Sequence, residues 1–208
     1  MITSIDTLPI HYVPGVRVFI SHQRNDKDIA REVQKRLEKM RIKSFLDATD
    51  KGRDGYKSVT DWIIDNLRES THVLVVYTDN TKKSAWVPFE IGVGYEREEG
   101  IAILAPQRIS DMPNYLDEFP LMRDFESLKE FASFCRDYPK PFAKSTSQVH
   151  FGTPVNENVQ EQSTIFKNDV LQKYSRLSMG QSAQENANIE LNYNYARFFI
   201  DELKNKLR

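Results

Sequence analysis

The sequence has little of what several protein classes require. Its single cysteine, Cys135, excludes an internal disulfide network and a cysteine-rich zinc site. Its 29 lysines and arginines nearly balance 30 aspartates and glutamates, so no overall field favours nucleic acid or an anionic membrane. No apolar run approaches the roughly 20 residues that span a bilayer. Residues 1–11 lack the basic flank and apolar run of a signal peptide. We therefore expect a cytoplasmic protein without nucleic-acid or membrane partners.

Several catalytic motifs are also missing. The first predicted strand is followed by neither GxGxxG nor GxxxxGKS/T, and no GxSxG elbow occurs anywhere in the chain. The four histidines are scattered and do not have metal-ligand spacing. A Rossmann dehydrogenase, a P-loop enzyme, a serine hydrolase and a zinc enzyme are thus all disfavoured, and we expect neither a metal nor a bound cofactor.

What the sequence does contain is an alternation of short apolar runs and amphipathic segments. The runs predict four strands and a shorter edge strand: residues 16–20, 42–46, 72–77, 101–104 and part of 119–125. The run at 72–77 is the most continuous, so we place it at the centre of the sheet. Strands alternating with helices at short spacing predict an α/β fold with a parallel sheet covered on both faces.

The composition divides the chain into three parts. Residues 1–15 form an irregular lead-in, residues 16–139 the α/β domain, and residues 140–208 a polar linker with a helical extension. Within the extension, residues 165–177 and 189–207 have helical apolar spacing. The extension is either a helical hairpin packed on the main domain or an appendage for partner binding or oligomerisation.

Ligands of parallel sheets bind beyond the carboxyl ends of the strands. Here that edge is lined by residues 21–24, by Asp47 and by the residues after Tyr77. A phospho-receiver domain is disfavoured although Asp47 ends a strand, because Ser21 and His22 stand where such a domain has an acidic pair.

Pro88 predicts the start of a helix. Because proline is tolerated in the first helical turn, we expect this helix to begin within residues 84–87 and to run to about Glu99. Gly92 and Gly94 remove side-chain bulk on the following turn. We expect another part of the molecule to approach closely there.

Trp86 and Glu90 are four residues apart, which places them one turn apart on the same side of that helix. The helix dipole favours the charged form of a carboxylate this near the N-terminus. An indole beside a negative charge suits a ligand with a flat ring and a developing positive charge. From these residues alone, the alternative is that Trp86 belongs to the core and Glu90 is solvated.

The order of these pieces resembles the Toll/interleukin-1 receptor (TIR) domain. The matching stretches, VFISH, FLD, STHVLVV and SAWVPFE, are residues 18–22, 45–47, 70–76 and 84–90. The resemblance covers about residues 16–138 and implies the TIR fold, a three-layer, flavodoxin-like arrangement with a parallel five-stranded sheet.

TIR domains are of two kinds, adaptors that only assemble and enzymes that break the nicotinamide–ribose bond of NAD. The enzymes carry a WxxxE arrangement on this helix, which Trp86 and Glu90 match, so the resemblance implies that Glu90 is catalytic. By the same resemblance, residues after the first two strands would bind NAD as a substrate: His22, Gln23, Arg24 and Asp47. One departure is that Pro88 and Phe89 stand where the family often has a cysteine or small polar residue.

The arrangement also resembles prokaryotic antiviral TIR proteins of the Thoeris type. These make a cyclic ADP-ribose-type signal that activates a separate effector, so the resemblance implies an NAD glycohydrolase or ADP-ribosyl cyclase. The alternative is a non-catalytic TIR module that self-associates through the glycine-bearing loop at residues 48–57.

Overall fold

The structure, a computed structural model, describes residues 11–46, 58–140 and 185–208. Five strands form one sheet in the order β2-β1-β3-β4-β5, and every neighbouring pair is parallel. The strands are β1 (Arg17–Ser21), β2 (Lys43–Leu46), β3 (His72–Val76), β4 (Gly100–Leu104) and β5 (Leu121–Met122). The predicted parallel sheet is confirmed, with β3 at its centre and β5 at one edge.

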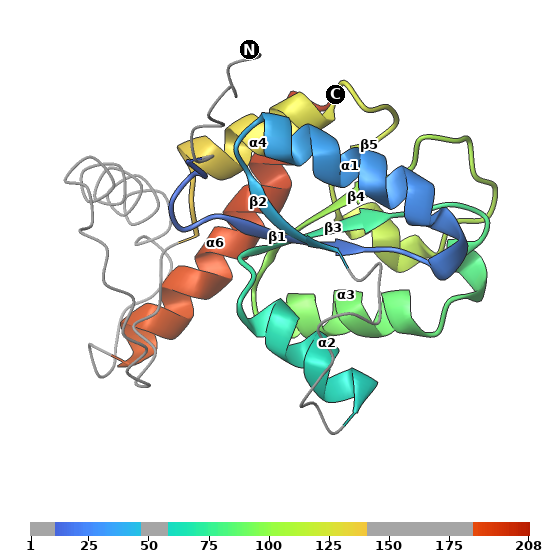
Figure 1. The fold of residues 1–208 in the computed structure, drawn as a ribbon. Helices are drawn as coiled ribbons and strands as arrows, with labels where there is room; N and C mark the ends of the chain where they lie inside the picture. The colour runs from blue at the N-terminus through green and yellow to red at the C-terminus, as the bar shows by residue number, and fades with distance from the viewer. Residues whose placement is uncertain (1–10, 47–57, 141–184) are drawn as a thin grey trace, which may run out of the picture.

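Helices cover both faces of the sheet (Figure 1). The α-helices are α1 (Lys27–Lys39), α2 (Val59–Arg68), α3 (Trp86–Glu96), α4 (Leu128–Asp137) and α6 (Glu185–Lys206). Short 3₁₀ helices lie in the connecting loops: η1 (Arg24–Asp26), η2 (Thr81–Lys83) and η3 (Asn114–Glu118). Helices α1 and α4 pack on one face, and α2 and α3 on the other. The three-layer arrangement is therefore as expected.

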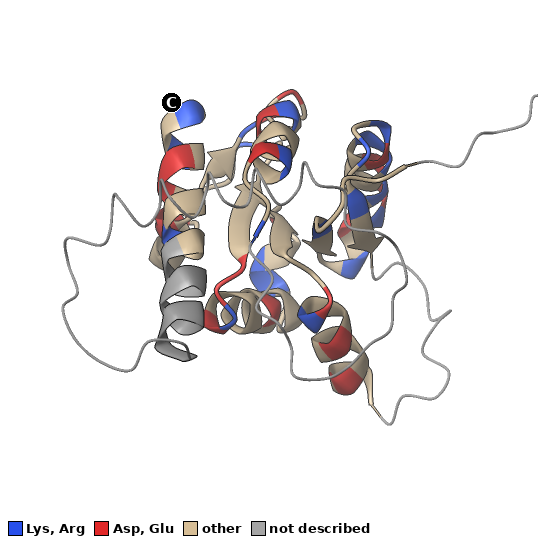
Figure 2. Cartoon of the chain, turned by 90° about the vertical axis from the view of Figure 1, so that its left-hand side faces the viewer, with Lys and Arg blue, Asp and Glu red and all other residues tan. Residues whose placement is uncertain are grey.

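The alternation of side chains along the strands divides the core in two. In β1, Val18 and Ile20 pack with α1, α4 and α6, whereas Phe19 packs with α2 and α3. The same parity holds in β3 and β4. Figure 2 shows basic and acidic residues interspersed along the helices, with the strands between them almost uncharged. In these strands, even-numbered residues therefore face α1, α4 and α6, and odd-numbered residues face α2 and α3.

Helix α3 begins at Trp86, as Pro88 predicts, but it ends at Glu96 and does not reach Glu99. The prediction of its end is wrong because the backbone turns at Glu98, whose φ is 56°. The amide of Glu99 then donates to the carbonyl of Gly94 at 3.0 Å, which closes the helix with a left-handed C-terminal motif.

The two glycines of α3 behave differently. A Cβ on Gly94 would lie 2.8 Å from Cγ2 of Val73, so the helix approaches β3 closely at this position, as predicted. A Cβ on Gly92 would meet nothing within 4 Å, so the expected close approach is absent there. The contact at Gly94 fixes the distance between α3 and the centre of the sheet.

The C-terminal helix α6 is part of the core. Tyr195, Phe199 and Leu203 are fully buried among side chains of the sheet and α4. The hydroxyl of Tyr195 lies 2.6 Å from Nε2 of His72 and also donates to the carbonyl of Tyr138. This helix packs on the α/β domain, and the other predicted helix, at residues 165–177, lies outside the described residues. Among the described residues, no helix has the length and apolarity that crossing a bilayer requires.

The buried His72 predicts a loss of stability in acid. Burial, with a smaller contribution from the charge of Lys140, lowers the pKa of His72 from 6.5 to about 3. Between these values the unfolded chain binds a proton that the folded chain does not, so stability falls as the pH falls. Relative to His72→Asn, the wild type should lose about 1.5 kcal/mol between pH 6.5 and 5.

Urea denaturation of both proteins at several pH values checks this. The comparison is needed because burial raises the pKa of Glu99 from 4.5 to about 7, against the opposing charges of Lys140 and Arg97. Protonation of Glu99 stabilises the folded chain as the pH falls, which is the opposite direction. Glu99 contributes equally to both proteins, so its effect cancels when the free energy of unfolding of the variant is subtracted from that of the wild type. Parallel pH profiles would contradict the assignment to His72.

Candidate active site

Glu90 lies on the face of α3 that is packed against the sheet. The buried residues of this helix are Val87, Glu90, Ile91 and Gly94, a spacing that forms one stripe along it. Glu90 is only 5% exposed. The alternative that Glu90 is a solvated surface residue is therefore wrong. A carboxylate on an apolar stripe carries a desolvation cost, which makes this position a candidate for function.

Ser21 meets Glu90 from the sheet. Ser21 is the last residue of β1. Its side chain points to the same side of the sheet as that of Phe19, the side that α3 covers. Its hydroxyl donates to Oε2 of Glu90 at 2.5 Å, and Ser21 itself is 1% exposed. The pair therefore lies at the carboxyl end of a strand, the edge at which ligands of parallel sheets bind.

Trp86 stands at the exposed start of α3. Its side chain is 43% exposed and meets the ring of Phe89 edge to face, with centroids 5.9 Å apart. The alternative that Trp86 belongs to the core is therefore wrong. The hydroxyl of Ser84, one residue before the N-cap residue Ala85, accepts a hydrogen bond from the amide of Val87 at 3.2 Å. An accessible indole thus stands one helical turn before the buried carboxylate.

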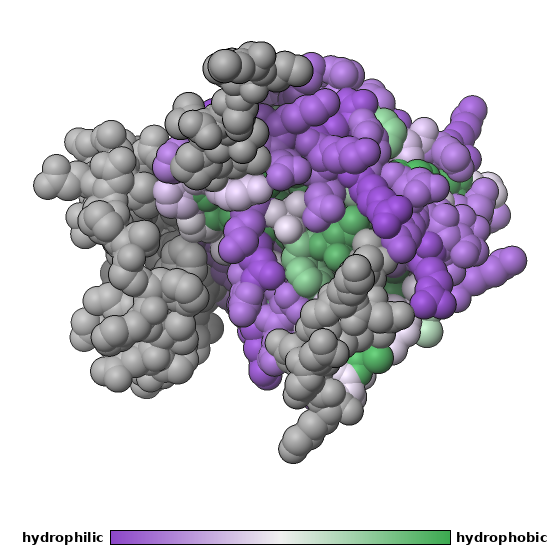
Figure 3. Space-filling model, viewed as in Figure 1, coloured by the Kyte–Doolittle hydropathy of each residue, from purple (hydrophilic) through white to green (hydrophobic). Residues whose placement is uncertain are grey.

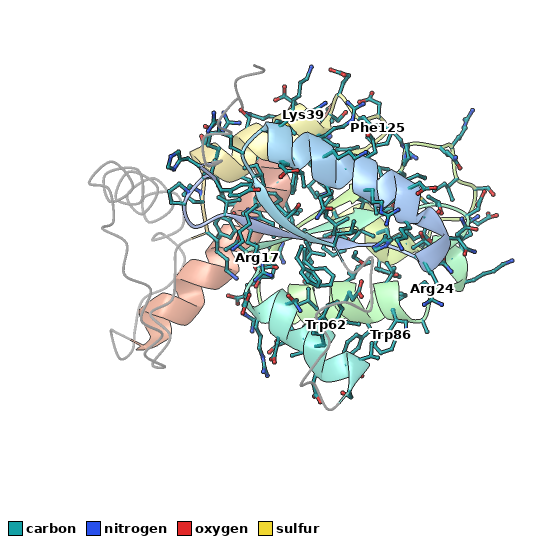
Figure 4. The ribbon with its side chains drawn as sticks, in the orientation of Figure 1. Arg17, Arg24, Lys39, Trp62, Trp86 and Phe125 are labelled. Carbon is teal, nitrogen blue, oxygen red and sulfur yellow. The ribbon has the colours of Figure 1, made fainter. Side chains whose placement is uncertain are left out.

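The loop after β1 lies at the same end of the sheet. His22 is partly buried, and its Nδ1 lies 3.3 Å from the carbonyl oxygen of Ile20. The side chain of Gln23 caps η1 by accepting from the amide of Asn25. Arg24 is exposed, and Figure 4 shows it at the same end of the molecule as Trp86. The structure thus brings these three predicted residues to the edge that holds Ser21 and Glu90.

Asp47 and the loop at residues 48–57 lie outside the described residues. The strand that leads to Asp47 is the edge strand β2, where Phe45 and Leu46 are partly buried. Figure 3 shows an apolar area near the end of this strand, on a face that is otherwise mostly hydrophilic. The role predicted for Asp47 stays a prediction.

Sequence reasoning missed the part that Asp26 plays. Asp26 occupies the cap position before α1, but its side chain makes no capping bond. It is instead buried and accepts hydrogen bonds from Thr78 at 2.7 Å and Asn80 at 2.8 Å. It thereby ties the loop after β1 to the loop that leads into α3. No local signal reveals this network, because the partners are 52 and 54 residues away.

Asp26→Ala should destabilise the fold by about 2–3 kcal/mol, because it leaves the donors of Thr78 and Asn80 without their acceptor. The free energy of unfolding in urea measures the loss. Asp28→Ala is the matched control, because the side chain of Asp28 is 99% exposed, and it should stay within about 0.5 kcal/mol of the wild type. Equal effects of the two variants would show that the buried network is not stabilising.

Two other titratable groups bear on the chemistry of the chain. Burial raises the pKa of the Cys135 thiol, which lies in the core beneath α6 and is not a reactive thiolate. Burial also raises the pKa of Tyr77, which follows β3 at the candidate edge, and the charges of Tyr115 and Asp79 add to this. Within the part of the chain that the structure describes, no group of three His, Cys, Asp or Glu side chains could hold a metal ion.

Comparison with known proteins finds similarity to TIR domains. The family model described as TIR domain matches residues 18–144. A crystal structure of the TIR domain of the Toll-related receptor TRR-2 from the lower metazoan Hydra magnipapillata is similar at 19% sequence identity, with a TM-score of 0.46. That match covers 58% of this chain and 92% of the other. No curated protein matches the chain.

Proposed function

Since the chain belongs to the TIR domain family, we propose that it is an enzyme that cleaves the nicotinamide–ribose bond of NAD, with Glu90 as the catalytic carboxylate. TIR domains include both enzymes and adaptors, so membership alone does not decide between them. The observation that carries the proposal is the burial of Glu90 at the carboxyl edge of the sheet, one turn after an exposed tryptophan. An adaptor has no need for a desolvated carboxylate at this position.

One carboxylate is enough for this reaction. Most glycosidases need a second carboxyl group to protonate the leaving group. In NAD the nicotinamide is already a cationic pyridinium, so the bond from C1′ to the ring nitrogen breaks with its electron pair and nicotinamide departs neutral. The positive charge develops on the ribose, where Glu90 stabilises it electrostatically. Water then adds to C1′ and loses a proton to give ADP-ribose, or another part of the substrate captures C1′ to give a cyclic product.

The remaining residues of the edge supply substrate contacts. The exposed indole of Trp86 would stack on a ring of the substrate or form one side of the site that holds the ring. The guanidinium of Arg24 would bind the diphosphate. His22, Gln23 and Asp47 would complete the substrate site. Of the four that the structure describes, Arg24 and Trp86 are exposed, and His22 and Gln23 are partly exposed.

The wider role that we propose follows from the resemblance to Thoeris-type proteins. The product would be a cyclic ADP-ribose-type signal, or ADP-ribose, made in the cytoplasm during antiphage immunity. A separate effector protein would bind that nucleotide. Self-association through the TIR domain would precede activity, so assays need concentrated protein.

One observation favours the alternative of a TIR module that only assembles. Helix α3 exposes the aromatic side chains of Trp86, Phe89 and Tyr95, which are 43%, 37% and 60% exposed, and the rings of Trp86 and Phe89 are in contact. Exposed aromatic side chains suit contact with another protein. This alternative predicts self-association without consumption of NAD.

Incubation of concentrated full-length protein with NAD, followed by separation of the nucleotides by mass, tests the proposal. Released nicotinamide together with ADP-ribose would identify a hydrolase. A product lighter than ADP-ribose by one water would identify a cyclase. Unchanged NAD in the presence of assembled protein would favour the module that only assembles.

A further inference from the structure

The hydrogen bond between Ser21 and Glu90 joins two buried polar side chains in an otherwise apolar contact between β1 and α3. Both side chains are buried, at 1% and 5% exposure, and the nearby positions on the same faces of β1 and α3 are apolar. Burying a hydroxyl and a carboxylate costs free energy that an apolar pair would not cost. Such a pair at the carboxyl edge of a parallel sheet is therefore a candidate for a functional role.

We propose that Ser21 is a positioning residue for Glu90, an inference that rests on the proposed function. The Ser21 hydroxyl holds one carboxylate oxygen, Oε2, and so fixes the orientation of the carboxylate that would face the ribose of the substrate. A glutamate side chain has three rotatable bonds, and fixing it before substrate arrives avoids the cost of ordering it during the reaction.

The element that carries Ser21 is rigid enough for this task. Ser21 is in register with Val75 of the central strand β3, and the preceding Ile20 is paired on both sides, with β2 and with β3. Sites built on strands hold their geometry better than sites on loops. On the other side of the pair, Gly94 keeps α3 close to Val73, one turn beyond Glu90. The donor and the acceptor are therefore each fixed by the packing of regular elements.

The hydrogen bond acts on the proposed catalytic group and not on the substrate. The Ser21 hydroxyl meets Oε2 of Glu90 inside the fold, and Ser21 itself is 1% exposed. Loss of the hydroxyl should therefore affect the chemical step and not substrate binding.

The test compares Ser21→Ala, Ser21→Cys and the wild type in NAD turnover by the full chain. Ser21→Ala should lower kcat about 10- to 100-fold while KM stays within about threefold, because a misplaced catalytic group costs this much. Ser21→Cys keeps a weak donor on a larger atom, so a Cys variant as stable as the wild type should have a kcat between those of Ala and wild type. Thermal denaturation of each protein shows what share of it is folded, and kcat is expressed per folded molecule.

Thr71→Val is the control for loss of a buried hydroxyl as such. Thr71 is 7% exposed and bonds Arg17 and His72 at the opposite end of the sheet. This variant should be less stable than wild type but keep its kcat per folded molecule.

The outcomes separate the two claims. An unchanged kcat in Ser21→Ala, or a raised KM at unchanged kcat, would overturn the role of Ser21 and leave the proposed function in place. A Ser21→Cys variant that is as stable as the wild type and turns over NAD no faster than Ser21→Ala would overturn that role as well. A wild type that leaves NAD intact would overturn the proposed function and the role of Ser21 with it.

Discussion

Glu90→Gln is expected to lower the rate of NAD cleavage by about 10³-fold or more while the fold stays intact. The amide keeps the size of the side chain and an oxygen that can accept from Ser21, so the buried contact survives. Under the proposed function, it removes the negative charge that would stabilise the ribose cation, and such electrostatic stabilisation is typically the largest single contribution to catalysis. The rate of nicotinamide release gives the loss of activity, and thermal denaturation shows that the variant is folded.

Glutamine is a better replacement than alanine here. Glu90→Ala would leave the buried hydroxyl of Ser21 without this acceptor, so a loss of activity could come from a loss of structure. Glu96→Gln serves as the matched control, because Glu96 is an exposed glutamate on the same helix and should keep full activity. Full turnover by Glu90→Gln would remove Glu90 from the mechanism.

Phe199→Ala in α6 is expected to cost about 3–5 kcal/mol of stability, the largest effect on folding that we predict. The ring is completely buried and lies 5.0 Å from the ring of His72 and 5.3 Å from that of Phe134, measured between centroids. Its removal leaves a cavity between α6, the sheet and α4. Such a loss is a large part of the roughly 5–15 kcal/mol that stabilises a typical domain.

Urea denaturation of Phe199→Ala beside Asp201→Ala measures this effect. Asp201 is exposed two residues further along α6, and its replacement should change stability by less than about 0.5 kcal/mol. Similar stabilities of Phe199→Ala and wild type would mean that α6 is not part of the folding unit.

Much of the fold follows from local patterns in the sequence. The apolar run at residues 72–77 predicts the central strand, and β3 is central. Ser58 predicts the start of a helix, and its hydroxyl accepts from the amide of Asp61 at the start of α2. Pro88 locates the start of α3. Each of these signals acts within a few residues, which is why the sequence alone reveals them.

The features that sequence patterns miss depend on contacts between distant residues. The burial of Glu90 depends on how α3 packs on β1, whose Ser21 is 69 residues away. The network of Asp26 likewise joins two loops that sequence spacing does not connect. The predicted end of α3 is wrong because Glu98 adopts the left-handed conformation that usually signals glycine. The candidate residues of the site could be named from the sequence, but their arrangement needed the structure.

The most direct test of the central claim is the release of nicotinamide from NAD by the full chain, followed over time for wild type and Glu90→Gln. Both proteins are assayed at the same folded concentration, over a range that includes conditions under which the chain self-associates. We predict that nicotinamide accumulates with wild type, and that with Glu90→Gln it does so at least about 10³-fold more slowly. Equal release by the two proteins, or none by assembled wild type at any concentration, would contradict the assignment of Glu90 as the catalytic carboxylate of an NAD-cleaving enzyme.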